Sequence, residues 1–384
     1  MNASKDTKRR LALGFFTSLS GGILSWKKIG TIGRELQLYR KLATLGLDVH
    51  VFTIEREKDI SWCKDNGESN HLAIHALYPN WLPYSRWLLV ILMPLLLVRM
   101  YFVGRNMDVL KTNQGHSGIH VMLASWLWHR PYISRSGYIL SEQLGNRGRK
   151  PSFKDRVLSC LERVTMRHAI ACFVPTPNLV DWCKKNIGCR RLELMPNNVD
   201  TELFCPSIAV ARGCYVIAVG RVVPFKRYDV LVRACARTGV ALKIVGDGPD
   251  CDRVIRIASE LGCRLEMLGR ISNNALPSLL ANAAVYVICS EYEGHPKSLV
   301  EAMACGCACI GTDNPGIRNQ IRDGENGILA EGTVAGLADA ITRIVSADTL
   351  AAKIRAGARQ YALENFSLDA LARKEASILS DLTQ

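Results

Sequence analysis

The first half of the chain alternates between short apolar runs and segments with helical spacing. Between the first two runs an apolar residue recurs at every third position from Leu36 to Leu45, which predicts an amphipathic helix that ends near Gly46. Strands that alternate with helices predict a parallel, doubly wound sheet. The apolar runs that we interpret as strands lie at residues 9–16, 49–54, 108–113, 131–137 and 171–176.

This alternation stops at residues 191–206 and then starts again. Asn197 and Asn198 indicate a turn there, because asparagine tolerates the left-handed region of backbone conformation. A chain of 384 residues has the length of two domains, so we interpret residues 191–206 as the connection between them. In the second half we predict strands at residues 215–220, 241–246, 264–269, 285–290 and 308–312, and helices at residues 227–238, 251–261, 274–283 and 296–306.

The longest apolar run covers residues 87–98, with Pro94 inside it and Arg99 after it. It is shorter than the roughly 20 residues that a helix needs to span a bilayer. The polar and basic start of the chain does not read as a secretory signal. We therefore expect a protein that is soluble or attached only to the surface of a membrane.

The 14 cysteines contain no C-x-x-C pair and show no disulfide framework. Cys305, Cys307 and Cys309 form the densest group, which raises the question of a metal site. No histidine or further cysteine stands at ligand spacing nearby, and the segment reads better as a helix end followed by a strand of small residues. Free cysteines of this kind are expected in a reducing cytoplasm.

The formal net charge of +14 is confined to one half of the chain. Residues 1–200 hold 29 Lys and Arg against 15 Asp and Glu, whereas residues 201–384 hold 20 of each. This asymmetry indicates that the first half faces an anionic partner, such as a membrane, a lipid pyrophosphate or a nucleic acid.

Two loops of the second half follow predicted strands and carry glycine and charge. Gly220, Arg221 and Lys226 follow one strand, and Gly246 and Gly248 follow the next. Ligands gather at the carboxyl ends of parallel strands, where two cations could neutralise a diphosphate and glycines admit a ligand close to the backbone. Solvated turns would explain the same residues, and a G-x-G on its own is weak evidence.

The strongest constellation is the segment from Glu293 to Glu301. Glu293 stands in a loop after a strand, a helix begins near Pro296, and Glu301 lies inside that helix. The amino end of a helix can bind an anion, while the two carboxylates could accept hydrogen bonds from sugar hydroxyls. Favourable interaction of glutamate with the helix dipole is the simpler alternative.

Taken together, the stretch from Gly220 to Gly327 closely resembles the retaining glycosyltransferases of family 4. Glu293 and Glu301, separated by seven residues, are the most specific part of the likeness. Residues 30–53, 195–204 and 364–372 extend it more weakly, although Asn198 stands where glycine is usual and the second glycine of a usual pair near residue 30 is not in place. The matching motifs are residues 220–227, 244–249, 268–272, 293–306, 311–317 and 323–330.

The resemblance implies an α/β protein of GT-B fold, with two Rossmann-like, doubly wound domains that face a central cleft. Residues 1–197 would form the acceptor-side domain and residues 198–362 the nucleotide-sugar-binding domain. Residues 363–384 would be a helix that crosses back to the first domain.

It also implies roles for single residues in this sequence. Arg221 and Lys226 would hold the donor diphosphate, Glu301 the ribose, and Glu293 the transferred sugar. Arg270 and Ile271 would border the nucleobase, and Gly30 would approach the diphosphate from the opposite wall. The backbone of the helix start would support phosphate and sugar; its residues are Gly294, His295, Pro296, Lys297, Ser298 and Leu299.

In the first domain the likeness is less complete. The family often has a histidine after the strand at residues 108–113, where this chain has Asn113, with His116 three residues later. Either side chain could face the transferred sugar, and a structural role for His116 is the alternative. By position only, Ser136, Gly137 and Glu142 would lie near the acceptor.

The implied reaction moves a hexose-type sugar, with retention, from a nucleotide-diphosphate sugar to a hydroxyl of a glycan or lipid-linked glycan, as in cell-envelope polysaccharide or lipopolysaccharide synthesis. The donor is a co-substrate, and we expect neither a cofactor nor a metal. A nucleotide-sugar epimerase or a phosphorylase of the same fold is the alternative. A nucleic-acid-binding protein is a third reading, but RNP, KH and C2H2 motifs are absent from the sequence, and we expect no nucleic-acid partner.

The charge asymmetry also predicts peripheral binding to an anionic membrane surface, at the inner face of the cytoplasmic membrane. Trp81, Tyr84, Trp87 and Tyr101 surround the long apolar run, as in aromatic belts. Residues 147–167 add a basic stretch, whose helical part is expected to place four apolar residues on one side. A buried helix and a solvated charged helix are the respective alternatives. The four apolar residues are Val157, Leu158, Leu161 and Val164.

Overall fold

The computed structural model describes the chain as two compact units. The first unit comprises residues up to 174, residues 179–194 and residues from 372 onward, and the second comprises residues 175–178 and 195–371. The described residues are 9–19, 21–65, 67, 69–83, 85–115, 118–146, 151–207 and 213–383, without the side chains of Lys64, Arg86 and Asn146.

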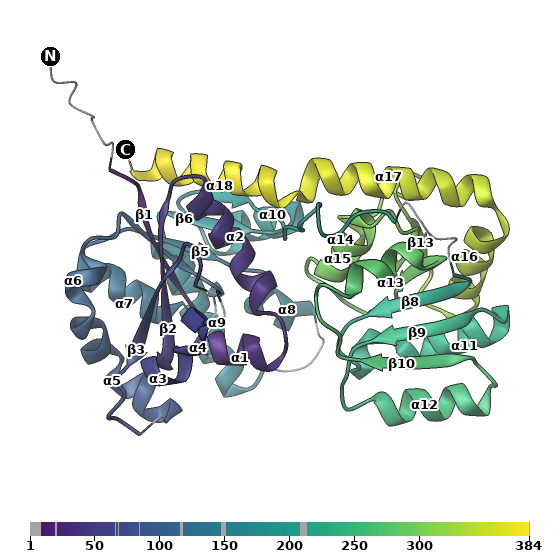
Figure 1. The fold of residues 1–384 in the computed structure, drawn as a ribbon, viewed down its shortest axis with the longest axis horizontal. Helices are drawn as coiled ribbons and strands as arrows, with labels where there is room; N and C mark the ends of the chain where they lie inside the picture. Colours follow the sequence, from purple (N-terminus) through teal and green to yellow (C-terminus); the bar gives the residue numbers. More distant parts are fainter. Residues whose placement is uncertain are drawn as a thin grey trace, which may run out of the picture. The chain divides into compact units, whose positions relative to one another are not determined.

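Among the described residues, the first unit holds a sheet of seven parallel strands in the order β3-β2-β1-β4-β5-β6-β7 (Figure 1). Its central strands β1, β4 and β5 are almost completely buried because helices cover both faces of the sheet. The strands are β1 (Ala12–Phe16), β2 (Asp48–Arg56), β3 (Ala73–Tyr78), β4 (Val109–Thr112), β5 (Tyr132–Arg135), β6 (Ala171–Val174) and β7 (Leu192–Leu194).

Two of these strands were not predicted from the sequence. β3 contains His75 and has only one well-buried end, so it lacks the apolar run that marks its neighbours. β7 falls at the start of the segment that we interpreted as the connection between domains. That interpretation was wrong for residues 192–194, which pair with β6 at the edge of the first sheet.

One face of the first sheet packs against α5, α7 and α10 around Leu97, Val121 and Cys183. On the other face, the ring of Phe15 stacks on the rings of Trp26 and Tyr39 from α1 and α2. The helices of this part of the chain are α1 (Ile23–Lys28), α2 (Ile32–Thr44), α3 (Glu57–Ile60), α4 (Trp62–Asp65), α5 (Arg86–Arg99), α6 (Tyr101–Gly104), α7 (Ile119–Trp128), α8 (Leu140–Asn146), α9 (Phe153–His168) and α10 (Pro177–Asn186).

The second unit holds, in its described part, a sheet of six parallel strands in the order β10-β9-β8-β11-β12-β13. Five of them were predicted, whereas β13 has only three residues and is too short to give a periodic signal. The strands are β8 (Tyr215–Val219), β9 (Ala241–Val245), β10 (Leu265–Gly269), β11 (Val285–Ile288), β12 (Cys309–Thr312) and β13 (Ile328–Ala330).

Two apolar cores lie on the two faces of this second sheet. One includes residues of α11, α12 and α16, and the other includes residues of α13, α14 and α17. The helices are η2 (Pro224–Lys226, a 3-10 turn), α11 (Tyr228–Thr238), α12 (Cys251–Glu260), α13 (Leu276–Asn282), α14 (Lys297–Ala304), α15 (Pro315–Arg318), α16 (Val334–Ser346), α17 (Asp348–Phe366) and α18 (Leu368–Thr383).

The end of the chain belongs to the first unit. From Ala372 onward α18 packs within that unit, and the Glu375 carboxylate accepts a hydrogen bond from the Lys111 ammonium of β4. Both side chains are buried, and the Lys111 ammonium also lies over the rings of Tyr39 and Phe173. Burial lowers the pKa of Lys111, and the Glu375 carboxylate opposes that shift.

The turn that we predicted at Asn197 and Asn198 is not formed. Neither residue has a positive φ. Instead the Asn197 side chain is buried and donates to the carbonyl of His295 at 2.7 Å, and the amide of Val199 donates to the carbonyl of Phe366. A tertiary hydrogen bond therefore replaces the local turn that the sequence suggested.

Candidate functional site

Strand order reverses between β8 and β11 in the second sheet, which makes the carboxyl ends of these strands the expected ligand position. The loop after β8 supplies Lys226, and the loop after β11 supplies Glu293. The Lys226 ammonium donates to Glu293 Oε1 at 2.5 Å, and the Ser290 hydroxyl donates to the same oxygen at 2.7 Å. Two residues 67 positions apart, both predicted as site residues, thus meet in one charged cluster.

A second set of contacts holds these two loops together. The Arg227 guanidinium donates to Glu291 at 3.0 Å, and the Phe225 and Tyr292 rings stack 4.6 Å apart. Arg227 adopts a left-handed φ of 54°, which turns the chain from η2 into α11. The charged cluster therefore lies on two loops that are held together by an ion pair and by ring stacking.

The glycines of the predicted motifs allow neighbouring loops to pack backbone against backbone. A Cβ on Gly246 would lie 1.9 Å from the Gly220 carbonyl oxygen, and one on Gly248 would lie 2.1 Å from the Val222 carbonyl oxygen. The amide of Gly246 also donates to the carbonyl of Gly269 at 2.7 Å. Close packing of the loops after β8, β9 and β10 accounts for Gly246 and Gly248 without a ligand.

The amino end of α14 lies beside the same cluster. Its N-cap, Pro296, comes three residues after Glu293, and the backbone N–H groups of its first turn lack acceptors within the helix. The Ser298 hydroxyl accepts from the buried Tyr286 hydroxyl at 2.8 Å, which fixes the first turn to β11. The loop after β12 packs against the loop that carries Glu293. The Asn314 side-chain amide donates to the carbonyl of Ser290, and a Cβ on Gly316 would lie 2.0 Å from the Glu293 carbonyl oxygen.

Several of the predicted site residues have buried side chains, so their backbone is the larger part of what they contribute to the site. Leu299 and Pro296 are buried, and the His295 ring packs edge-on against Phe366 at 5.2 Å. Glu301, on α14, is only 4% exposed, so little of its carboxylate can meet a ligand without rearrangement. Glu293 and Lys226 are 13% and 14% exposed and are the more accessible pair.

The remaining donor-site candidates stay at the surface. Arg221 is exposed, and no described residue forms an ion pair with it. Arg270 lies 3.4 Å from Asp247, with both side chains more than half exposed, while Ile271 packs against the core below. Arg221 is therefore a cation available to an anionic ligand at the end of β8.

Sequence reasoning missed three residues of this cluster. Ser290 was predicted only as the end of a strand, and Asn314 only as part of a motif. Tyr228 was assigned to a helix, yet its hydroxyl lies next to Gly220. Burial, with smaller contributions from Cys289 and Glu293, raises the pKa of Tyr228, so the hydroxyl stays protonated and can donate.

The first unit also carries candidate residues, in the loops after β4 and β5 and between α1 and α2. The amide of Asn113 donates to the carbonyl of Phe16 at the reversal between β1 and β4, and Gly30 joins α1 to α2 with a φ of 70°. Ser136 is buried, and the amide of Gly137 donates to the Gln114 side chain at 3.0 Å. His116 lies outside the described residues, as does Tyr84 of the apolar segment.

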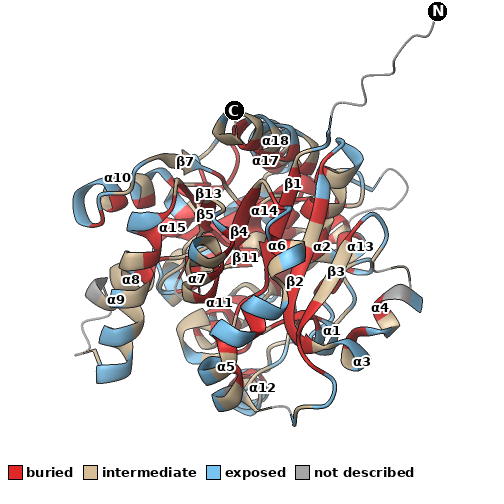
Figure 2. Cartoon of the chain, turned by 90° about the vertical axis from the view of Figure 1, so that its left-hand side faces the viewer, coloured by how far each residue is buried: buried red, intermediate tan, exposed pale blue. Residues whose placement is uncertain are grey.

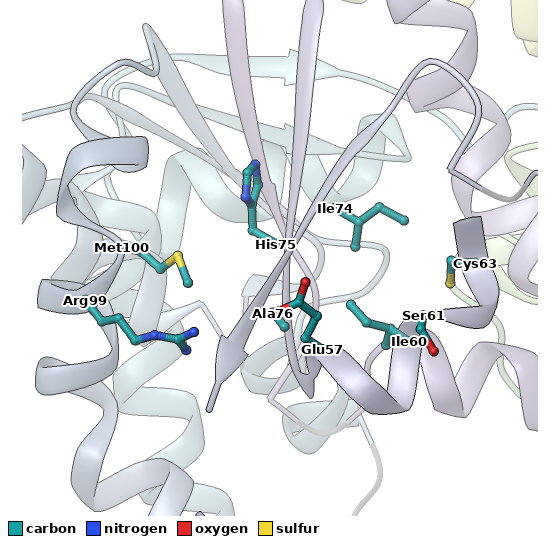
Figure 3. Close-up of a pocket in the computed structure, with 9 residues that line it drawn as sticks. All are labelled: Glu57, Ile60, Ser61, Cys63, Ile74, His75, Ala76, Arg99 and Met100. Carbon is teal, nitrogen blue, oxygen red and sulfur yellow. The ribbon is translucent and has the colours of Figure 1, made fainter. Parts of the chain in front are cut away.

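A cavity of about 190 Å³ in the first unit contains none of the predicted site residues. Figure 3 shows it between α3, α4, β3 and the end of α5, with Glu57, His75 and Arg99 among its lining. His75 Nε2 lies 2.8 Å from His50 Nδ1. Burial, and then the proximity of His50, lowers the pKa of His75 to about 4.

Within the described ranges, no group of three or more His, Cys, Asp or Glu side chains is arranged to hold a metal ion. Cys305, Cys307 and Cys309 are buried thiols, and the thiol of Cys309 donates to the carbonyl of Cys307. The described helices are each too short or too polar to cross a membrane.

Two family models match the chain, one in each half. Residues 210–361 match the model of "Glycosyl transferases group 1", and residues 30–198 match that of "Glycosyl transferase 4-like domain". Both halves of the chain therefore match glycosyltransferase family models, as the motifs of the second half predicted.

Curated relatives match about two fifths to one half of the chain. The N-acetyl-α-D-glucosaminyl L-malate synthase of Bacillus anthracis is 32% identical over 164 residues, which are 41% of this chain and 42% of that protein. The lipopolysaccharide core biosynthesis glycosyltransferase LpsE of Rhizobium meliloti is 31% identical over 160 residues, 41% of this chain and 46% of that protein. The match thus spans less than half the length of either relative.

Among solved structures, HepE from Anabaena in complex with UDP and glucose aligns with a TM-score of 0.75. The alignment covers 97% of this chain and 100% of that one at 20% identity. The two parallel-sheet units have the GT-B fold, which confirms the predicted fold class.

Proposed function

We propose, from the glycosyltransferase family models that both units match, that this chain is a retaining glycosyltransferase that uses a nucleotide-diphosphate sugar. It would move a hexose-type sugar to a hydroxyl of a glycan or lipid-linked glycan on the cytoplasmic side of the cell envelope. The observation that carries the proposal is the Lys226–Glu293 cluster at the strand reversal of the second sheet, beside exposed Arg221 and the amino end of α14.

The cluster suits a leaving group that gains negative charge. As the bond to the sugar breaks, charge grows on the diphosphate, and donors already in place stabilise it without reorganisation. Arg221 could approach as a bidentate fork, Lys226 as a point charge, and the N–H groups of α14 as neutral donors. Lys226 would then exchange part of its contact with Glu293 for a phosphate oxygen.

The contacts of Glu293 favour a sugar-binding role over attack on the sugar. Oε1 already accepts from Lys226 and Ser290, and hydrogen bonds of this kind stabilise the carboxylate and weaken it as a nucleophile. The second oxygen could accept from a sugar hydroxyl. We therefore propose that the acceptor hydroxyl attacks from the face that the diphosphate leaves, with a donor phosphate oxygen as base.

The acceptor is proposed from the relatives. The name of LpsE assigns that protein to the lipopolysaccharide core, and the excess of basic residues in the first half of this chain suits an anionic, lipid-linked glycan. An envelope glycan precursor is accordingly the acceptor class that we propose.

A donor panel tests the proposal directly. UDP-, GDP- and ADP-sugars are added one at a time, and melting temperature and nucleotide release are recorded. One nucleotide series should raise the melting temperature by mass action, and the Arg221→Ala variant should weaken that shift. If no nucleotide sugar changes the melting temperature and none is consumed, the donor site is wrongly assigned.

The same assay addresses the metal. We expect turnover to continue in EDTA, because two side-chain cations and a helix terminus can replace a metal at the diphosphate. Loss of turnover that Mg²⁺ or Mn²⁺ restores would contradict this expectation.

A further inference from the structure

The outer face of α5 is as apolar as its buried face. Leu89, Met93 and Leu97 are buried in the core of the first unit. The opposite side is exposed and lacks any charged residue between the two arginines that bound the helix. Exposed stretches along α5 are visible in Figure 2. The large exposed side chains of α5, as relative exposure, are Trp87 (81%), Val90 (58%), Ile91 (69%), Leu95 (66%) and Val98 (52%).

This stripe continues onto the neighbouring elements. Phe102 of α6 is 76% exposed and follows the stripe at helical spacing, and Trp81, just before α5, is 81% exposed. On α7, which packs against both helices, Trp126 is 79% exposed, while the Trp128 indole donates to the carbonyl of Leu97. We call the exposed large side chains of this region the apolar ridge; they are Trp81, Trp87, Val90, Ile91, Leu95, Val98, Phe102 and Trp126. Large exposed apolar side chains gathered on neighbouring elements in this way indicate an interaction site.

The charges in the segment that carries the apolar ridge are almost all positive. Outside this segment, Glu57 lines a cavity together with Arg99 at the end of α5. Between Glu68 and Glu142 the sequence contains a single carboxylate, Asp108, which pairs with Arg9. Arg105 is exposed at the end of α6, with its guanidinium over the Tyr101 ring. The Arg130 guanidinium is fixed beside it by hydrogen bonds to the Arg105 carbonyl. The ridge therefore combines large apolar side chains with arginines and almost no negative charge.

We propose that the apolar ridge is the surface by which this protein lies on an anionic lipid bilayer. Tryptophan and arginine at the edges of an aliphatic stripe match the water, headgroup and acyl layers that such a surface presents. α5 is too short to span the bilayer, so the stripe would enter the acyl boundary lengthwise. This inference does not depend on the proposed sugar transfer.

Charge complementarity favours lipid over a second copy of this chain. In a twofold dimer the same patch faces itself, which would bring arginines of both copies together with hardly a carboxylate to pair them. An anionic bilayer supplies the missing negative charge. The basic helix α9, our other sequence-based candidate, packs against α7. It buries Glu162 and Met166 and leaves Phe153 exposed, and it supplies no side chain of the ridge.

The test is co-sedimentation of the full chain with two kinds of vesicle, pure phosphatidylcholine and an equal mixture of phosphatidylcholine and phosphatidylglycerol. We expect binding to the anionic vesicles that weakens with salt but does not vanish, because apolar contacts persist when charge is screened. Ile91→Glu should reduce binding about tenfold or more. Ile255→Glu, at an equally aliphatic position that is 47% exposed on α12, is the matched control and should bind as the wild type does.

Three results would overturn the proposal. One is failure of the wild type to bind anionic vesicles at low salt, and another is equal binding by Ile91→Glu and the wild type. The third is a wild-type dimer that Ile91→Glu converts to a monomer, since this would assign the ridge to a second copy. Both substituted positions are exposed, so unchanged melting temperatures should show that each variant is folded.

Discussion

At the scale of single residues, Lys226 and Glu293 act as one unit, because each side chain is mostly buried and is the other's counter-ion. The sequence identified both residues through the likeness of their loops, but it could not show that they touch. Ser290, the third member, carried no signal, since a serine at a strand end is common.

We predict that Lys226→Met and Glu293→Gln each lower kcat/KM by about 100-fold or more, as expected when a preorganised electrostatic group is lost. The double variant should be little worse than either single one, because residues that act together give non-additive losses. Lys353→Met, an exposed lysine of α17, is the control and should retain full activity. Fully additive losses would mean that the two residues act independently.

His75 gives the first unit a dependence on pH. Its pKa of about 4 lies below the ordinary value of 6.5, so the unfolded chain takes up a proton at higher pH than the folded chain does. The contribution of neutral, buried His75 to the free energy of unfolding is therefore complete above about pH 6.5 and is lost as the pH falls toward 4. Melting temperatures across this window should fall less steeply for His75→Gln than for the wild type. If the melting temperatures of His75→Gln and the wild type fell in parallel with pH, His75 would be excluded as the source of the pH dependence.

At the scale of elements, the sequence predicted the long, periodic segments and missed the short or mixed ones. β11 is buried on both faces and reads as an unbroken apolar run. β3, β7 and β13 are edge or short strands, whose pairing depends on neighbours that a local pattern does not contain. Likewise the order of strands, which brings the loops after β8 and β11 together, follows from crossover rules and not from any single segment.

The loop contacts predict a distinction between two glycines. Gly316→Ala should displace the backbone of Glu293, because its Cβ would lie 2.0 Å from that carbonyl oxygen and 2.8 Å from that of Gly294. Gly332→Ala should be tolerated, since its Cβ would meet only the Thr312 methyl at 3.6 Å. We expect Gly316→Ala to lose at least tenfold in kcat/KM, as small misplacements of catalytic groups do. Equal activity of the two variants would show that loop position is unimportant.

At the scale of the whole molecule, the Lys111–Glu375 pair joins residues 264 positions apart inside the first unit. A buried charge left without its partner costs about 3–5 kcal/mol. Glu375→Ala should therefore destabilise the first unit, while Lys111→Met combined with Glu375→Leu should recover most of the loss, because apolar replacement of a buried pair is often neutral. Hydrogen exchange of β4 amides should accelerate in Glu375→Ala. Equal acceleration in β11 would mean that the effect is not confined to the first unit.

The place of Glu375 in the sequence also sets an order of events during synthesis. A ribosome releases all strands of the first sheet early, yet the carboxylate that neutralises Lys111 is translated only after every strand of the second unit. Domains usually mature from the amino end during translation, but here the later-made unit can finish first. In a nascent chain arrested before residue 372, a protease should accordingly cut the first unit, while the second unit resists.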